Sequence, residues 1–207
     1  MDFRIFTIDH VIKKESPAFR IYSTQVNEVI HALYEITLAP HEFIRLPVLN
    51  ALFYLPTVGE FALIDKEITT QMEPGTCGMY WIQEECKLKN LSNALAQIII
   101  VSIQEMKIKS SNVVQTFDSI GMNTCVQILE YHRFQFVLCR IGERVISKKI
   151  IEGLPAYAYV ISGVLEVNDR WLDQGESLRL LDAGEIEMEG MTKENWLLLI
   201  VNTNNLS

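Results

Sequence analysis

Residues 160–169 read Val-Ile-Ser-Gly-Val-Leu-Glu-Val-Asn-Asp, and this stretch decides the fold. A β-rich run is broken at Ser162-Gly163 and resumes at Val164. Asn168-Asp169 then gives a hairpin signal, because both residues tolerate the positive φ that a type I′ turn demands. The segment therefore predicts two short strands, one of which enters a tight turn.

The residues that follow keep the same pattern of short strands and turns. Asp173-Gln174-Gly175 and Asp182-Ala183-Gly184 are typical turn sequences. Isoleucine and methionine alternate with glutamates over residues 185–189, as in a strand with one exposed face. Residues 196–201 are continuously apolar and β-rich, which is typical of a buried strand.

The first half of the chain repeats this layout. Residues 59–65 resemble residues 163–169, and each segment leads through a hairpin to a turn glycine, Gly75 or Gly175. The two copies lie about a hundred residues apart, which favours duplicated domains over a solenoid. Because short strands at regular spacing are typical of a sandwich or barrel, we expect an all-β chain with two tandem barrels.

The expected domain boundaries follow from the polar, turn-like residues 109–112. They predict an N-terminal barrel over residues 1–110, a linker over residues 111–125 and a C-terminal barrel over residues 126–207. A short turn of helix is expected within the linker.

Composition limits the classes of function. The 207 residues are 49% hydrophobic and 21% charged, as in a packed globular protein, and the net charge of −8 disfavours direct nucleic-acid binding. The sequence begins without the features of a signal peptide, and its apolar runs are too short to cross a membrane, so a cytoplasmic protein is expected. Four widely spaced cysteines are expected to be reduced and mostly buried: Cys77, Cys86, Cys125 and Cys139.

Residues 160–169, followed by residues 172–178, resemble the second cupin barrel of pirin-like proteins. Further segments are similar to other strands of that family: residues 33–40, 59–65, 185–188 and 196–201. The resemblance covers nearly the whole chain. It implies two tandem cupin barrels, each a double-stranded β-helix or jelly roll.

Pirin-like proteins typically hold a metal, usually iron, in the first barrel, through a His-x-His pair and later His and Glu ligands. Aligned on Gly59, the His-x-His positions fall on Arg45 and Pro47; shifted by one residue, they fall on Ile44 and Leu46. Neither alignment supplies a metal ligand. The resemblance therefore implies the fold of the family without its usual metal site.

The later ligand positions fall near Cys86 and Leu88, which leaves one thiol at best. Since iron needs several His or carboxylate ligands, no metal is expected. A rebuilt site would have to draw on His41, His31 or Cys86. His41-Glu42, however, has the character of a polar turn after Pro40.

We therefore expect a non-catalytic bicupin that binds a small apolar molecule or a protein partner without a metal. The predicted pocket lies in the first barrel, and its lining residues are Ile44, Leu46, Tyr54, Met79, Trp81 and Cys86. Two alternatives stay open, namely an iron-dependent dioxygenase of the quercetinase type and a transcriptional adaptor that acts through protein contacts. The fold alone cannot choose among them, because one fold hosts many functions.

Overall fold

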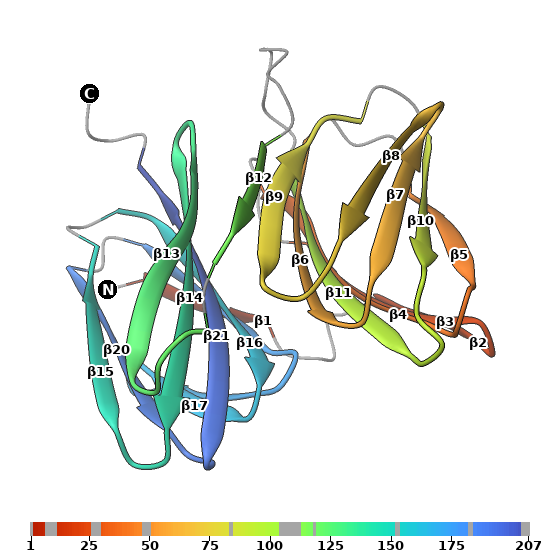
Figure 1. Cartoon of the computed structure of the whole chain (residues 1–207). Helices are drawn as coiled ribbons and strands as arrows, with labels where there is room; N and C mark the ends of the chain where they lie inside the picture. The colour runs from red at the N-terminus through yellow and green to blue at the C-terminus, as the bar shows by residue number, and fades with distance from the viewer. Residues whose placement is uncertain are drawn as a thin grey trace. The chain divides into compact units, whose positions relative to one another are not determined.

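The computed structural model describes residues 2–6, 12–25, 30–46, 51–82, 85–103, 113–117, 119–151, 154–181 and 184–203. These residues form β-strands and turns, which confirms the predicted all-β class (Figure 1). The part of the chain so described contains no helix able to span a membrane. The chain folds as two units, which we call the first barrel (residues 11–117) and the second barrel (residues 1–10 and 118–207).

The first barrel is built from two antiparallel sheets. The larger sheet has the strand order β12-β9-β6-β11-β4-β3-β2, and the smaller has the order β5-β10-β7-β8. The strands of the first barrel are β2 (Ile12–Ser16), β3 (Phe19–Gln25), β4 (Ile30–Leu38), β5 (Phe43–Leu46), β6 (Ala51–Val58), β7 (Phe61–Asp65), β8 (Ile68–Met72), β9 (Thr76–Tyr80), β10 (Cys86–Asn90), β11 (Ala96–Ile103) and β12 (Val113–Thr116).

The second barrel has the same plan. Its larger sheet has the order β1-β19-β16-β21-β14-β13, and its smaller sheet has the order β15-β20-β17-β18. The strands of the second barrel are β1 (Asp2–Phe6), β13 (Thr124–Tyr131), β14 (Phe134–Gly142), β15 (Ile146–Ile150), β16 (Ala156–Ser162), β17 (Val164–Val167), β18 (Trp171–Asp173), β19 (Ser177–Leu181), β20 (Glu185–Gly190) and β21 (Glu194–Asn202). The two strand orders match position for position, apart from the additional β2, as a duplicated domain requires.

The expected domain boundaries need correction at both ends of the first barrel. β1 pairs with β19 of the second barrel, although residues 1–110 were expected to form one domain. β12 pairs with β9 of the first barrel, and β13 already begins at Thr124, although residues 111–125 were expected to form a linker with a turn of helix. A pairing between strands far apart in sequence depends on the edges that a folded sheet leaves open, and local sequence does not reveal those edges.

The predicted turns are present. Asn168 and Asp169 have φ angles of 46° and 60°, as the type I′ hairpin turn between β17 and β18 requires. Gly163 has a φ of 83°, and a Cβ atom there would overlap the Asn195 side chain. Glycine at position 163 is thus required by both backbone conformation and space.

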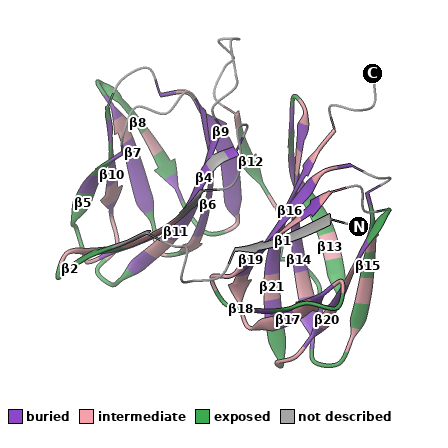
Figure 2. Ribbon diagram, turned by 180° about the vertical axis from the view of Figure 1, so that it is seen from behind, coloured by how far each residue is buried: buried purple, intermediate pink, exposed green. Residues whose placement is uncertain are grey.

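Each barrel buries one apolar cluster between its two sheets. β20 shows the predicted alternation, with Ile186 and Met188 buried in the cluster of the second barrel. The strand predicted over residues 196–201 is also present, and Leu197–Val201 of β21 are fully or almost fully buried (Figure 2). Since both faces of β21 are covered, its sequence is continuously apolar and does not alternate.

One buried asparagine closes an end of each cluster. Asn90 in the first barrel donates from Nδ2 to the carbonyl oxygens of Leu38, Ala39 and Ala94, at 2.8–3.1 Å. Asn195 in the second barrel donates to two carbonyl oxygens and accepts from the Val164 amide. Because all these backbone groups lie where strands end, each asparagine satisfies polar groups that the sheets leave unpaired.

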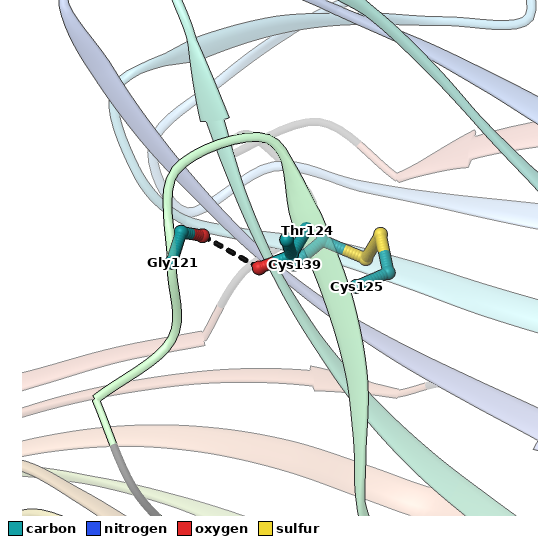
Figure 3. The surroundings of a disulfide bond; sticks show 4 residues. All are labelled: Gly121, Thr124, Cys125 and Cys139. Carbon is teal, nitrogen blue, oxygen red and sulfur yellow. Dashed lines mark hydrogen bonds between the residues drawn. A yellow bond between two sulfur atoms is a disulfide. The ribbon is translucent and has the colours of Figure 1, made fainter.

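The four cysteines are not all reduced. Cys125 and Cys139 are direct cross-strand partners in β13 and β14, and a disulfide joins them (Figure 3). Cys77 and Cys86 are not part of a disulfide and are buried, as predicted. The expectation of four thiols was wrong because it rested on spacing in sequence, whereas the disulfide depends on the register of β13 against β14.

Candidate functional site

The positions that correspond to a cupin metal site lie side by side in the first barrel. Leu46 of β5 is paired with Cys86 of β10, and Ile44 is paired with Leu88. All four belong to the apolar cluster, and their exposed fractions are 7% for Ile44, 4% for Leu46 and 0% for Cys86 and Leu88. The place where the resemblance implies metal ligands therefore holds three aliphatic side chains and one thiol.

The structure distinguishes the two alignments of the His-x-His pair. Arg45 is exposed and forms an ion pair with Glu85 at 3.2 Å, so it points away from the cluster. Pro47 lies outside the described residues. Ile44 and Leu46 face the interior, which favours the alignment shifted by one residue.

The predicted pocket is only partly assembled in the interior. Tyr54 joins Ile44, Leu46 and Cys86 in the buried cluster of the first barrel. Met79 is buried but does not belong to this cluster, because its neighbour Tyr80 does and successive side chains on a strand point to opposite faces. Trp81 follows β9, is half-buried and also lies outside the cluster, where Ile82 takes its place. Met79 and Trp81 thus stay predicted pocket residues that lie outside this apolar cluster.

Among the described residues of the first barrel, two side-chain polar atoms are buried without a hydrogen-bond partner. They are the Tyr54 hydroxyl and Oδ1 of Asp65. Asp65 shares the inward face of β7 with Phe61 and Leu63, since these residues alternate along the strand. The Asp65 carboxylate was not predicted as a site residue, although the alternation over residues 61–65 already places it on the buried face.

The Cys86 thiol is held in its neutral form. Burial, followed by the negative charge of Asp65, raises the pKa of Cys86 to about 12. A nucleophilic or metal-binding cysteine needs the thiolate, which positive surroundings favour and a nearby carboxylate disfavours. Burial likewise raises the pKa of the Tyr54 hydroxyl to about 12. The interior of the first barrel therefore holds a neutral thiol and a neutral hydroxyl, those of Cys86 and Tyr54, near the Asp65 carboxylate.

The alternative metal ligands are not brought together. His41 lies in the turn before β5 with a φ of 61°, is exposed, and its Nε2 lies 3.0 Å from Oδ1 of Asn93. His31 belongs to β4, but its side chain lies outside the described part of the chain. Within the described ranges, no three His, Cys, Asp or Glu side chains form a group that could hold a metal ion.

The matching positions of the second barrel show no metal-binding set either. Ser147 is paired with Met188, and Lys149 with Ile186, so these four correspond to Ile44, Leu88, Leu46 and Cys86 of the first barrel. A hydroxyl, an ammonium and two apolar side chains do not form a site for iron. In neither barrel do the described residues at these positions fit the metal that the resemblance implies.

Comparison with solved structures supports the bicupin fold. The pirin YhhW from Escherichia coli, solved in complex with nickel(II), matches with a TM-score of 0.78 over 97% of this chain and 99% of that chain, at 10% sequence identity. AerE from Microcystis aeruginosa matches with a TM-score of 0.74 over 93% and 96%, at 12% identity. A mutant of the oxalate decarboxylase OxdC from Bacillus subtilis matches with a TM-score of 0.67 over 96% and 76%, at 8% identity.

No protein-family model matches the sequence, and no curated protein is significantly similar to it. The structural likeness, at such low identity, concerns the fold alone. The strand order and the near-complete overlap show the two-barrel cupin fold. The matches to YhhW confirm the pirin-like bicupin fold that the sequence predicts.

Proposed function

We propose that this chain is a non-catalytic, pirin-like bicupin that works without a metal and binds a small apolar molecule in the first barrel. One observation carries the proposal. The four interior positions that correspond to the metal site are occupied by Ile44, Leu46, Cys86 and Leu88, all of them buried. An interior of this composition favours apolar contacts over metal coordination.

The two unpaired polar atoms support a ligand of mixed character. Buried polar groups are normally hydrogen-bonded, so the Tyr54 hydroxyl and Asp65 Oδ1 each call for a partner. A mainly apolar ligand with one hydrogen-bonding group would supply such a partner, and so would a buried water molecule. A protein partner on the outside of the barrel would leave both atoms unsatisfied.

The quercetinase-type alternative has weaker support. It would require several nitrogen or oxygen ligands around one point, whereas Cys86 is a neutral thiol, Asp65 is a buried carboxylate near it, and the neighbouring Glu85 is exposed and paired with Arg45. Adaptor activity through protein contacts remains compatible with the fold, but no observation on the described residues favours it over ligand binding.

Metal content is the first test. The protein is purified without chelator or histidine tag, analysed for metals, and then incubated with ferrous iron and analysed again. We expect less than about a tenth of one equivalent of metal per chain in both states, because one neutral thiol and one carboxylate do not retain iron. Retention of about one metal ion per chain would contradict the proposal.

Apolar binding is tested with benzene as the probe. Benzene enters dry apolar cavities in proteins, and methyl chemical shifts report where it binds. We expect shifts of the Ile44, Leu46 and Leu88 methyl groups. Leu88→Phe should abolish them by filling the interior, whereas Met188→Phe, the equivalent change in the second barrel, should leave them intact.

Thermal unfolding of both variants checks that each is folded. If Leu88→Phe does not fold, the methyl map of the wild-type chain still decides the question. Shifts confined to the second barrel, or no shifts at all, would contradict apolar binding in the first barrel.

A further inference from the structure

The duplication gives each barrel a matching outer surface. The smaller sheets, β5-β10-β7-β8 and β15-β20-β17-β18, each turn one face towards the apolar cluster and the other face outwards. The inward residues are apolar in both barrels. The outward residues of β10 and β20, which are equivalent strands, carry charges of opposite sign, lysines on β10 and glutamates on β20.

The outer surface of the second barrel is acidic. Its carboxylates come from β17 and β20, and with Lys148 of β15 they form what we call the acidic face: Glu166, Glu185, Glu187, Glu189 and Lys148. Lys148 pairs with Glu185 at 3.1 Å and with Glu187 at 2.7 Å. Four carboxylates thus face a single ammonium group.

Two of these carboxylates oppose each other directly. Glu166 and Glu189 are cross-strand partners, and the ion pairs of the described residues include neither of them. Like charges directly opposite in a sheet are unfavourable. A cation from outside the barrel would relieve this repulsion.

Apolar side chains flank the acidic face. Ile146 lies opposite Glu189, Ile150 lies opposite Glu185, and Trp171 lies opposite Glu166, so each shares the outward side of its partner. These three side chains are 55%, 69% and 64% exposed. Figure 2 shows the exposed and half-exposed stretches along β15. An exposed tryptophan and two exposed isoleucines beside charged groups are typical of an interaction surface.

The equivalent outer surface of the first barrel is basic. Its charges come from β5 and β10, and we call Arg45, Lys87 and Lys89 the basic face. Arg45 lies directly opposite Lys87 and is partly neutralised by Glu85. An apolar side chain again accompanies the charges, since Phe43 is 49% exposed and the Lys87 ammonium lies 5.6 Å from the centre of its ring.

The reversal of charge occurs at matching positions. In the pairing of β10 with β5, Lys87 lies opposite Arg45, and in the pairing of β20 with β15, Glu187 lies opposite Lys148. Lys89 lies opposite the exposed Phe43, just as Glu189 lies opposite the exposed Ile146. Two surfaces with the same strand geometry therefore present a central pair of like charges, lysines on one and glutamates on the other.

We propose that the acidic face of one copy of this chain binds the basic face of a second copy. Such a contact is heterologous, because it joins different surfaces of two identical chains and leaves one face of each kind free. The net charge of −8 opposes association at long range, but the two faces attract each other within a screening length of about 10 Å at 0.1 M salt. The association is expected to weaken as the salt concentration rises.

Charge reversal tests this proposal. Sedimentation velocity measures the average mass of the full chain, from micromolar concentrations up to about 1 mM, where a weak contact is populated. We expect the mass to increase with concentration at about 0.1 M salt and to stay at that of the monomer at about 0.5 M salt. Lys87→Glu with Lys89→Glu should abolish the increase, and so should Glu187→Lys with Glu189→Lys.

Mixing the two double variants provides the decisive result. Each variant has two faces of the same sign, but together they again offer one acidic and one basic face, so the mixture should associate as the wild-type chain does. Lys193→Glu and Glu130→Lys, which are exposed positions away from both faces, serve as controls and should leave association unchanged. Circular dichroism checks that every variant is folded.

Three outcomes would overturn the proposal. The first is a wild-type chain that stays monomeric at every concentration. The second is double variants that associate as strongly as the wild type, and the third is a mixture of the two variants that fails to associate. In the first case, titration of the wild-type chain and of the Trp171→Phe variant with a lysine-rich peptide, followed by tryptophan fluorescence, would show whether the acidic face instead binds a basic partner.

Discussion

Asn90 shows how one side chain can complete a barrel. Its amide nitrogen donates to three carbonyl oxygens, and its oxygen accepts from the Ser92 amide at 2.7 Å. Asn90 is fully buried, so water cannot reach these backbone groups to replace its hydrogen bonds. Asn90 stabilises the first barrel because its single side chain satisfies several buried backbone groups.

We predict that Asn90→Ala destabilises the protein by about 2–4 kcal/mol, since it leaves several buried backbone groups without partners. Urea denaturation measures the change in the free energy of unfolding. Asn93→Ala is the matched control, because Asn93 is exposed and contacts only the exposed His41 among its described partners. Equal losses in both variants would contradict this role for Asn90.

The Cys86 thiol is predicted to be unreactive in the folded chain. Its pKa of about 12 leaves almost no thiolate at pH 8, and the residue is fully buried. Iodoacetamide should therefore modify Cys86 only after denaturation, as peptide mass spectrometry would show. Rapid alkylation of Cys86 in the native protein would indicate an open interior and an accessible thiolate.

The sequence was informative at the level of single residues wherever alternation was clear. The buried positions of Ile186 and Met188 and the hairpin turn at Asn168-Asp169 were predicted correctly. The alignment of the His-x-His positions could not be chosen, because a shift of one residue moves every side chain of a strand to the opposite face. The burial of Ile44 and Leu46 and the exposure of Arg45 in the folded barrel distinguish the two alignments.

Among the elements, β13 lies at one edge of the larger sheet of the second barrel. It is an edge strand that pairs with β14, and the Cys125–Cys139 disulfide joins the two. The turn before β13 is also held, since the Thr124 hydroxyl donates to the Gly121 carbonyl at 2.6 Å (Figure 3). The disulfide and the turn thus stabilise β13, which pairs with a neighbouring strand of the sheet on one side only.

Loss of this disulfide is predicted to reduce stability by about 3 kcal/mol, the usual effect of closing a loop of roughly 15 residues. The sequence separation between the two cysteines is 14. Urea denaturation with and without dithiothreitol measures the loss. The double variant Cys125→Ser with Cys139→Ser should be less stable and insensitive to the reductant.

The oxidation state of the pair also bears on the expected location. Disulfides are rare in the reducing cytoplasm, which is where the sequence analysis placed the protein. Thiol trapping at the moment of cell lysis, followed by mass spectrometry of the intact chain, distinguishes four free thiols from two. Four trapped thiols in vivo, together with a disulfide after air oxidation, would reconcile the cytoplasmic expectation with the fold.

For the whole molecule, the buried ionisable groups make stability sensitive to alkali. Burial raises the pKa of Cys77 and Cys86 from 9.0 to about 12, and that of Tyr54 from 10.0 to about 12. The unfolded chain therefore loses these protons at a lower pH than the folded chain does. Their contribution to stability is complete below pH 9 and is lost as the pH rises from about 9 to 12.

We expect the free energy of unfolding to fall steadily over that range, as urea titrations at pH 8, 9, 10 and 11 would show. Cys86→Ala removes one of the three groups, so its stability should fall less steeply with pH, relative to its own value at pH 8. A stability that is constant from pH 8 to pH 11 would contradict the burial of these groups.

The architecture of the whole chain was predictable from its repeated pattern of strands and turn glycines, whereas the connections between distant segments were not. Two tandem barrels followed from the similarity of residues 59–65 to residues 163–169. The assignment of β1 to the second barrel and of β12, expected in the linker, to the first barrel did not, because the pairing partner of an edge strand is fixed only when the sheets have formed.

The pairing of β1 with β19 has a consequence for synthesis on the ribosome. Phe3 pairs with Leu180, so β1 has no partner until β19 has been synthesised. At 5–20 residues per second, β1 remains without its partner for roughly 10–35 seconds. During this interval, β1 is an unpaired strand available to other nascent chains. Co-translational folding of the first barrel can proceed in the meantime, but the second barrel acquires this edge strand only after β19 has been made.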